Sequence, residues 1–293
     1  MAEFQPKHIL CPVDFSPQSA AALKVAGRVA MAFGAEVLAL HAHRLEAPVY
    51  FTSAQTQALK TQLRRSAKSG REYLREFADE HLPEKVTHSV LLADRDPVSA
   101  ILRAIRDWRP GLVVMATHGR TGLTRIRLGS VMESVLRQSS VPVLTVGPAV
   151  KPASSLAPSR RILCPVDLED SSHSAFQHAA VLAEATGAEL IALHVAKEGA
   201  NDDRTPGKIC EQLCAWVPGG MRNRCSIREV VRRGHPAEQI VAEAKPSRAD
   251  MVVIEARPRR FLDSILFGST TESVIRNSPS PVLSVMRDPV EVD

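Results

Sequence analysis

The segment Ile9-Leu10-Cys11-Pro12-Val13-Asp14 returns unchanged at residues 162–167, which lie 153 positions further along the chain. After a shorter middle stretch the offset between matching residues becomes 139, and Gly129-Ser130 then matches residues 268–269. The units of solenoid proteins run to roughly 20–50 residues, so these copies are too long to be solenoid repeats. The sequence therefore predicts two domains of the same architecture.

Length and composition agree with two globular domains. The chain has 293 residues, and a typical domain has roughly 100–200. The hydrophobic fraction of 44% and the charged fraction of 24% are ordinary for a globular protein. The sequence begins without a signal-like segment, and no apolar run approaches the roughly 20 residues that a membrane-spanning helix needs. We therefore expect a cytoplasmic protein that does not contact a membrane.

Charge and cysteine content narrow the partners and the redox setting. A net charge of +5 and a pI near 9.1 fit a small polyanionic ligand, whereas nucleic-acid binding would call for a basic stripe with stacking aromatics. Five cysteines are an odd number and favour reduced thiols over a disulfide framework. Cys210 and Cys214 can share a helix face, where a structural role is favoured over a metal site. No metal site and no nucleic-acid partner are predicted.

Apolar periodicity predicts alternating strands and helices in the first copy. Strands are expected at Lys7–Val13, Val37–Leu40, Lys85–Leu92, Leu112–Met115 and Val141–Val146. Helices are expected at Gln18–Phe33, Ser53–Glu80 and Pro97–Asp107, with a last one beginning near Gly129. Such alternation requires parallel strands joined by right-handed crossovers. The predicted fold is α/β, with a doubly wound five-stranded parallel sheet.

The second copy repeats this order with one shorter helix, at Lys208–Trp216. Its strands are expected at Arg161–Val166, Leu190–His194, Ile227–Val231, Met251–Ile254 and Pro281–Val285. We place the domains at residues 1–147 and 161–293, with a proline-containing linker at 148–160. The last strand of each copy is apolar and would lie at a sheet edge, so the copies should meet there, packed about a pseudo-two-fold axis.

Three segments of the first copy should converge at the carboxyl end of its sheet, where the winding direction reverses and ligands of such folds bind. Asp14 follows the first strand, and Ala42 follows the second. A loop rich in glycine and basic residues runs from Ala116 to Ser130. Glycine lets the backbone approach phosphate oxygens, and the helix that begins near Gly129 offers free N–H groups. The loop predicts a phosphate site, in which Ser130 can cap the helix or bind phosphate.

At this loop the chain resembles a tandem universal stress protein, and the resemblance covers nearly the whole chain. ATP-binding members of that family carry Gly-x2-Gly-x9-Gly-Ser/Thr after the fourth strand, and here the pattern reads Ala116-x2-Gly119-x9-Gly129-Ser130. The resemblance implies an adenine-nucleotide α-hydrolase-like fold, with Asp14 and the backbone near Ala42 holding adenine and ribose. It implies that phosphate is held by the loop residues Ala116, Thr117, His118, Gly119, Arg120, Gly129 and Ser130. The implied cofactor is ATP, with or without Mg²⁺.

The second copy departs from this pattern, because the same frame reads Glu255-x2-Pro258-x9-Gly268-Ser269. Proline removes an N–H and fixes φ, and a carboxylate at Glu255 would repel phosphate if it pointed into the pocket. Asp167, Gly268 and Ser269 are retained. A weak site, a different ligand or only the folding demands of the turn remain open for this copy.

For several side chains near the loop, two roles are compatible with the sequence. His41 and His194 end the second strand of each copy, where a structural histidine is favoured over a catalytic one. His118 either shapes the loop or approaches phosphate. Arg95 stands where the second copy has Gly234, and it either narrows the rim of the pocket or reaches a phosphate. No Ser/His/Asp arrangement can be assembled, so no catalytic residue is predicted.

The favoured function is a stress-response protein that binds ATP in its N-terminal domain as a nucleotide-responsive regulatory module. The alternatives are a scaffold that binds protein partners without nucleotide, and a slow ATPase. An enzyme of the wider adenine-nucleotide α/β class is less favoured, because Asp14-Phe15-Ser16-Pro17-Gln18-Ser19 replaces the Ser-Gly-Gly-x-Asp-Ser loop of those enzymes. The resemblance also suggests a homodimer of the tandem chain.

Overall fold

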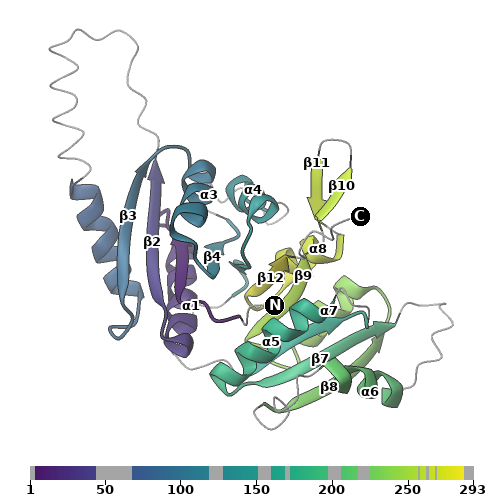
Figure 1. Cartoon of the computed structure of the whole chain (residues 1–293). Helices are drawn as coiled ribbons and strands as arrows, with labels where there is room; N and C mark the ends of the chain where they lie inside the picture. The colour runs from purple at the N-terminus through teal and green to yellow at the C-terminus, as the bar shows by residue number, and fades with distance from the viewer. Residues whose placement is uncertain are drawn as a thin grey trace, which may run out of the picture.

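The computed structural model of the chain describes residues 4–43, 68–118, 128–150, 160–168, 172–196, 206–216, 225–256, 258–261, 264–267 and 269–286. Within these ranges the strands form one large sheet with helices against it, and a separate short hairpin (Figure 1). Residues 151–159 of the predicted linker lie outside the described residues, so the predicted domain limits stay a prediction.

The first half follows the predicted order. Its strands are β1 (His8–Pro12), β2 (Glu36–His43), β3 (His88–Asp94), β4 (Leu112–Ala116) and β5 (Val143–Val146). Its helices are α1 (Pro17–Phe33), residues 68–81, α3 (Pro97–Trp108) and α4 (Ser130–Gln138). Residues 53–67, the first part of the predicted helix Ser53–Glu80, lie outside the described residues. α1 ends at Gly34, whose φ of 64° is left-handed, as expected for a glycine C-cap.

The second half repeats the pattern, and its described residues include a short hairpin as well. Its strands are β6 (Arg161–Val166), β7 (Glu189–Ala196), β8 (Ile227–Arg233), β9 (Met251–Ala256) and β12 (Val282–Met286). Its helices are α5 (His173–Thr186), α6 (Pro206–Trp216), α7 (Pro236–Ala244) and α8 (Ser269–Asn277). The hairpin consists of β10 (Pro258–Phe261) and β11 (Ser264–Phe267), which pair antiparallel.

The large sheet has ten strands in the order β3-β2-β1-β4-β5-β12-β9-β6-β7-β8. Strands within each half are parallel, which confirms a doubly wound five-stranded sheet in each copy. The two predicted edge strands, β5 and β12, pair antiparallel, with Leu144 opposite Leu283. Thr145 Oγ1 also donates to the carbonyl oxygen of Val282 at 3.1 Å. Each half therefore covers the apolar edge of the other.

Strands β1, β3, β5 and β12 begin one to three residues later than predicted, and side-chain hydrogen bonds explain the late starts of β5 and β12. Ser139 Oγ accepts the N–H of Val141 at 3.2 Å and donates to the carbonyl oxygen of Val141 at 2.7 Å, so Val141 belongs to a turn and β5 starts at Val143. Ser278 makes the same two bonds to Ser280, and β12 starts after it.

The alternating side chains of the strands supply two apolar layers. One layer holds Cys11 and Cys164 and packs against α1, residues 68–81 and α5, while the other packs against α3, α4, α7 and α8. Both cysteines are 0% exposed, and burial raises the pKa of each thiol above its ordinary range. They are small core residues. Among the described helices, none is long and apolar enough to cross a membrane.

The hairpin stands where a degenerate loop was expected. β10 begins at Pro258, which replaces a loop glycine of the family pattern, and β11 ends immediately before the Gly268-Ser269 pair. β11 contacts α4 of the first half, and Figure 1 shows the hairpin beside that helix. In the second half an antiparallel hairpin therefore lies where the family pattern predicts a phosphate loop.

Candidate functional site

Several of the predicted site residues of the first half follow β1 or belong to the strands that flank it. β1 lies between β2 and β4 and is parallel to both. The chain leaves β1 through α1 to reach β2, and it reaches β4 from the other side through α3, so the carboxyl end of β1 is the switch point. Ala42 lies within β2 opposite Ala93, which corrects the expectation that it follows the strand. Ala116 is the last residue of β4.

Asp14 is held in a local turn at this switch point. Its Oδ1 accepts the backbone N–H of Ser16 at 3.1 Å and the hydroxyl of Ser16 at 2.6 Å. Ser16 in turn caps α1 by accepting the N–H of Ser19, so Asp14 supports the cap and is not itself the cap. The carboxylate is half-buried and lies at the carboxyl edge of the sheet, where a ligand's hydroxyl groups can reach it.

An aromatic cluster beside Asp14 was not predicted. Phe15 has a φ of 63° and lies 4.5 Å from the His41 ring, 4.8 Å from Tyr73 and 5.3 Å from Phe77, measured between ring centroids. His41 Nδ1 lies 2.7 Å from the carbonyl oxygen of Val13, an acceptor, so Nδ1 is the donor. The spacing of Tyr73 and Phe77 by four residues on a helix was the available sequence signal.

The same turn exists in the second half. His194 Nδ1 donates to the carbonyl oxygen of Val166 at 3.0 Å, and Leu168 has a φ of 63°. Asp167 accepts the hydroxyl of Ser172. Both histidines therefore fix the end of the first strand in their half, as the structural reading predicted. The turn is a property of the repeated fold and does not by itself mark a ligand site.

The amino end of α4 lies against the end of β4. Gly129 is its N-cap residue, and among the described residues no side chain caps the helix, which corrects the expectation that Ser130 can do so. The N–H of Gly129 donates to the carbonyl oxygen of Thr117 at 2.9 Å, so the helix end lies against the end of β4. A Cβ at Gly129 would lie 2.9 Å from that oxygen, a distance that side chains do not tolerate. Glycine is therefore required for this close approach.

The first N–H groups of an α-helix have no intrahelical partner, and α4 begins beside the carboxyl end of β4. Ser130 is the first helical residue and is exposed. Glu133, in the same first turn, forms an ion pair with Arg137, which offsets the charge that would otherwise oppose an anion. A helix end of this kind binds phosphate or carboxylate groups.

The structure describes only some of the other predicted site residues. Thr117 is buried, and its Oγ1 lies 2.9 Å from His118 Nδ1. Gly119 and Arg120 lie outside the described residues. In the second half, Glu255 is 8% exposed in β9, and its carbonyl oxygen accepts the Thr271 hydroxyl at 3.2 Å. Among the described side chains, no group of three His, Cys, Asp or Glu residues is arranged to hold a metal ion.

The sequence profile described as the Universal stress protein family matches residues 6–147, 158–211 and 222–285. The matched segments make up most of the chain and include both copies of the repeat. The chain belongs to the universal stress protein family. Its two copies are two family units in tandem.

Individual family members support this assignment. A universal stress protein of Mycolicibacterium smegmatis is 26% identical over 294 residues, which cover 94% of this chain and 96% of that protein. A universal stress protein of Methanocaldococcus jannaschii is 31% identical over 140 residues, or 48% of this chain and 81% of its own length. The crystal structure of a universal stress protein from Archaeoglobus fulgidus covers 97% of this chain with a TM-score of 0.69 at 22% identity, and so shares the fold.

Proposed function

We propose that this universal stress protein binds ATP in its first half and acts as a nucleotide-responsive regulatory module. The amino end of α4 carries the proposal: no side chain among the described residues caps it, and it lies against β4 through a contact that only glycine at position 129 allows. The triphosphate would accept N–H groups from this helix end, together with Ser130 and the loop that contains Gly119 and Arg120.

Adenine and ribose would lie on the other side of the switch point, near Asp14 and Ala42. The turn that holds Asp14 is already formed by Ser16 and His41, so binding would not have to order it. Tyr73 is 54% exposed beside Phe15, and it offers an aromatic face at the rim of the same end of the sheet. Both features support the proposed orientation of the nucleotide.

Mg²⁺ would be carried by the phosphates themselves, because the described residues offer no acidic cluster for it. Hydrolysis is not part of the proposal, since the described residues include no acidic cluster to hold a metal ion that activates water. The second half is proposed not to bind ATP, because Pro258 begins a strand at the position of a loop glycine.

The test compares Gly129→Ala with Gly268→Ala in the full chain. Isothermal titration with MgATP should show one site, and Gly129→Ala should lower its affinity at least tenfold, because the added methyl group displaces α4 from Thr117. Gly268→Ala, the matched change in the second half, should bind ATP as the unmodified chain does. Absence of ATP binding by the unmodified chain, or loss only in Gly268→Ala, would refute the proposal and favour the scaffold.

A further inference from the structure

The second half contains a polar pocket at the edge of the sheet opposite its switch point. The loops that precede β6, β7, β8 and β9 enclose this amino-end pocket, which has a volume of about 530 Å³. Its charged side chains come from Arg160, Arg161, Glu189, Arg248 and Asp250. The volume lies within the range of small-molecule sites, roughly 300–1,000 Å³.

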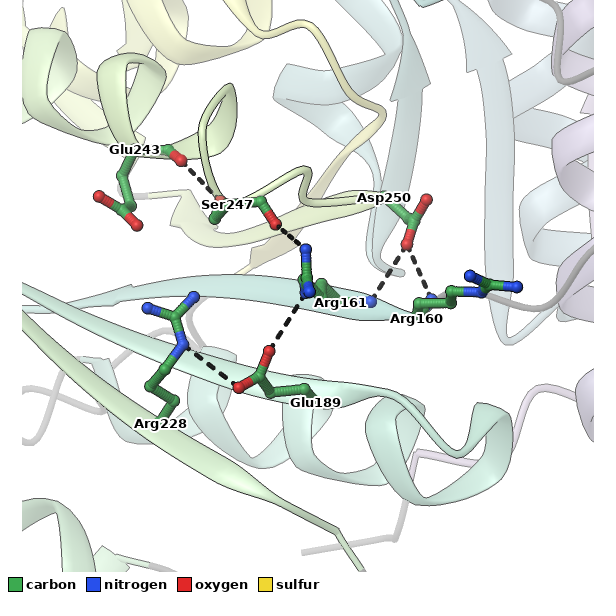
Figure 2. A network of polar contacts seen from close by, with 7 residues as sticks. All are labelled: Arg160, Arg161, Glu189, Arg228, Glu243, Ser247 and Asp250. Carbon is green, nitrogen blue, oxygen red and sulfur yellow. Dashed lines mark hydrogen bonds and ion pairs between the residues drawn. The ribbon is translucent and has the colours of Figure 1, made fainter.

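Both carboxylates of the pocket are engaged by the protein itself (Figure 2). Asp250 Oδ2 accepts the backbone N–H groups of Arg160 at 2.8 Å and Arg161 at 3.1 Å. Glu189 forms ion pairs with Arg161 Nε at 3.3 Å and with Arg228 Nε at 3.2 Å. These contacts hold the loops together and leave the acidic groups little capacity for a cation.

In contrast to the two carboxylates, the guanidinium groups of two pocket arginines form no ion pair with the described residues. Figure 2 shows the Arg160 guanidinium turned away from the bonded groups, with only its backbone N–H taking part. Arg160 and Arg248 are both exposed, and among the described residues neither guanidinium has an ion-pair partner. Arg161, by contrast, is fixed by Glu189 and by donating Nη1 to the carbonyl oxygen of Ser247 at 2.9 Å.

Further charged residues near the pocket leave its net charge positive. Arg28 of α1 lies close enough for Asp250 to act on it, although burial is the larger effect and lowers the pKa of Arg28. Glu184 acts on Cys225, which lines the pocket. The cations are Arg28, Arg160, Arg161, Arg228 and Arg248, and the anions are Glu184, Glu189 and Asp250. The arginines outnumber the carboxylates, so the pocket is net positive.

The matching place in the first half is packed differently. The backbone hydrogen bonds are the same in both halves. The N–H of Glu36 donates to the carbonyl oxygen of Lys7 at 2.9 Å, and the N–H of Glu189 donates to the carbonyl oxygen of Arg160 at 2.8 Å. Gly111 stands at the position of Asp250, and a Cβ there would lie 2.8 Å from the Cα of Pro6. The pocket's acidic anchor therefore could not fit in the first half.

Aromatic packing replaces the polar network there as well. The His8 ring lies 4.9 Å from Trp108, at the positions that Arg161 and Ser247 take in the second half. The polar pocket is thus a feature of the second copy and does not follow from the shared fold.

We propose that the amino-end pocket binds a small oxyanion with at least two negative charges on phosphate or carboxylate groups, held by Arg160 and Arg248. A guanidinium binds such groups through paired N–H donors, which adds geometric specificity to charge attraction. Asp250 and Glu189 act as positioning residues, because they order the loops and Arg161. The site is separate from the proposed nucleotide site, because residues of the second half line the pocket and residues of the first half form the nucleotide site.

The experiment titrates the full chain by calorimetry with inorganic pyrophosphate and, separately, with citrate at low ionic strength. At least one probe should bind saturably, and the double variant Arg160→Gln/Arg248→Gln should weaken it at least tenfold. The matched control is Lys7→Gln/Arg109→Gln, which removes the same two charges from the equivalent positions. Arg109 and Arg248 even share left-handed φ values of 49° and 50°. The control should change affinity less than twofold.

Three outcomes would overturn the proposal: neither probe binds, both double variants weaken binding equally, or the pocket variant binds normally. Pyrophosphate could also bind at α4, so Gly129→Ala is titrated in parallel. Binding that survives Gly129→Ala and is lost in the pocket variant supports the proposal whether or not ATP binds the first half. Binding lost only in Gly129→Ala assigns the anion to α4 and refutes it. Urea unfolding of each variant checks that the fold is retained.

Discussion

Leu283→Ala tests whether the β5–β12 contact stabilises both halves. Leu283 is 1% exposed and faces Leu144, which is also 1% exposed, across the antiparallel pair. The change removes three carbon atoms, worth about 0.8 kcal/mol each in transfer free energy, and leaves a cavity beside β5. We therefore expect a loss of about 3 kcal/mol in the free energy of unfolding. At a urea slope of about 3 kcal/mol/M, the midpoint should fall by roughly 1 M.

The assay uses the two tryptophans, Trp108 in the first half and Trp216 in the second. Variants that retain one tryptophan report the unfolding of each half by fluorescence. Leu283→Ala should lower the midpoint at both, because β5 of the first half loses a core neighbour. The control is Ile240→Ala, a buried change on α7 of the second half, which shows how far a core loss outside the β5–β12 pair lowers the midpoint reported by Trp108. An unchanged Trp108 midpoint in Leu283→Ala would refute the reasoning.

Two further predictions concern single side chains. Glu184→Gln should speed alkylation of Cys225 at pH 8, because burial and then the Glu184 charge raise the pKa of this thiol, and only the thiolate reacts. Peptide mapping measures the rate, the fully buried Cys11 should stay unmodified as an internal control, and an unchanged Cys225 rate would contradict the electrostatic effect. Gly34→Ala should lower the free energy of unfolding by about 1 kcal/mol, since its φ is left-handed while nothing lies within 4 Å of the added methyl group. Urea unfolding measures the loss, and equal or greater stability would show that the helix end relaxes freely.

Local signals predicted most of the fold. The apolar run Ile162-Leu163-Cys164 and the expected strand Arg161–Val166 match β6, because a buried parallel strand needs little beyond its own apolar residues. Because the sequence is repeated, each element predicted in one copy also predicts the equivalent element in the other. Strand starts were less predictable, since the hydrogen bonds of Ser139 and Ser278 to the backbone compete with the sheet over two or three residues.

The hairpin shows where the repeat misled the prediction. The frame of the phosphate loop predicts only a loss of glycines at residues 255–268. The available signal for a strand is the apolar run Ile265-Leu266-Phe267, which pairs with residues 258–260. The loss of a glycine motif does not by itself indicate which structure replaces the loop.

The candidate sites depended on contacts between distant residues, which periodicity does not report. The position of Asp14 near the helix end at Gly129 could be predicted, because parallel strands bring their carboxyl ends together. The amino-end pocket could not, since Arg160 and Asp250 are 90 residues apart and meet only when β6 and β9 pair. Nothing in either local sequence indicates that contact.

The pairing of β5 with β12 also sets how the two sheets respond to dilution. Both strands belong to one polypeptide, so their association is a first-order step whose extent does not fall when the protein becomes scarce. A tether of this kind holds its ends at an effective concentration on the order of millimolar, far above that of most free subunits. Two separate chains that met along the same edge would part as their level dropped. The duplicated chain keeps its ten strands together at any cellular abundance.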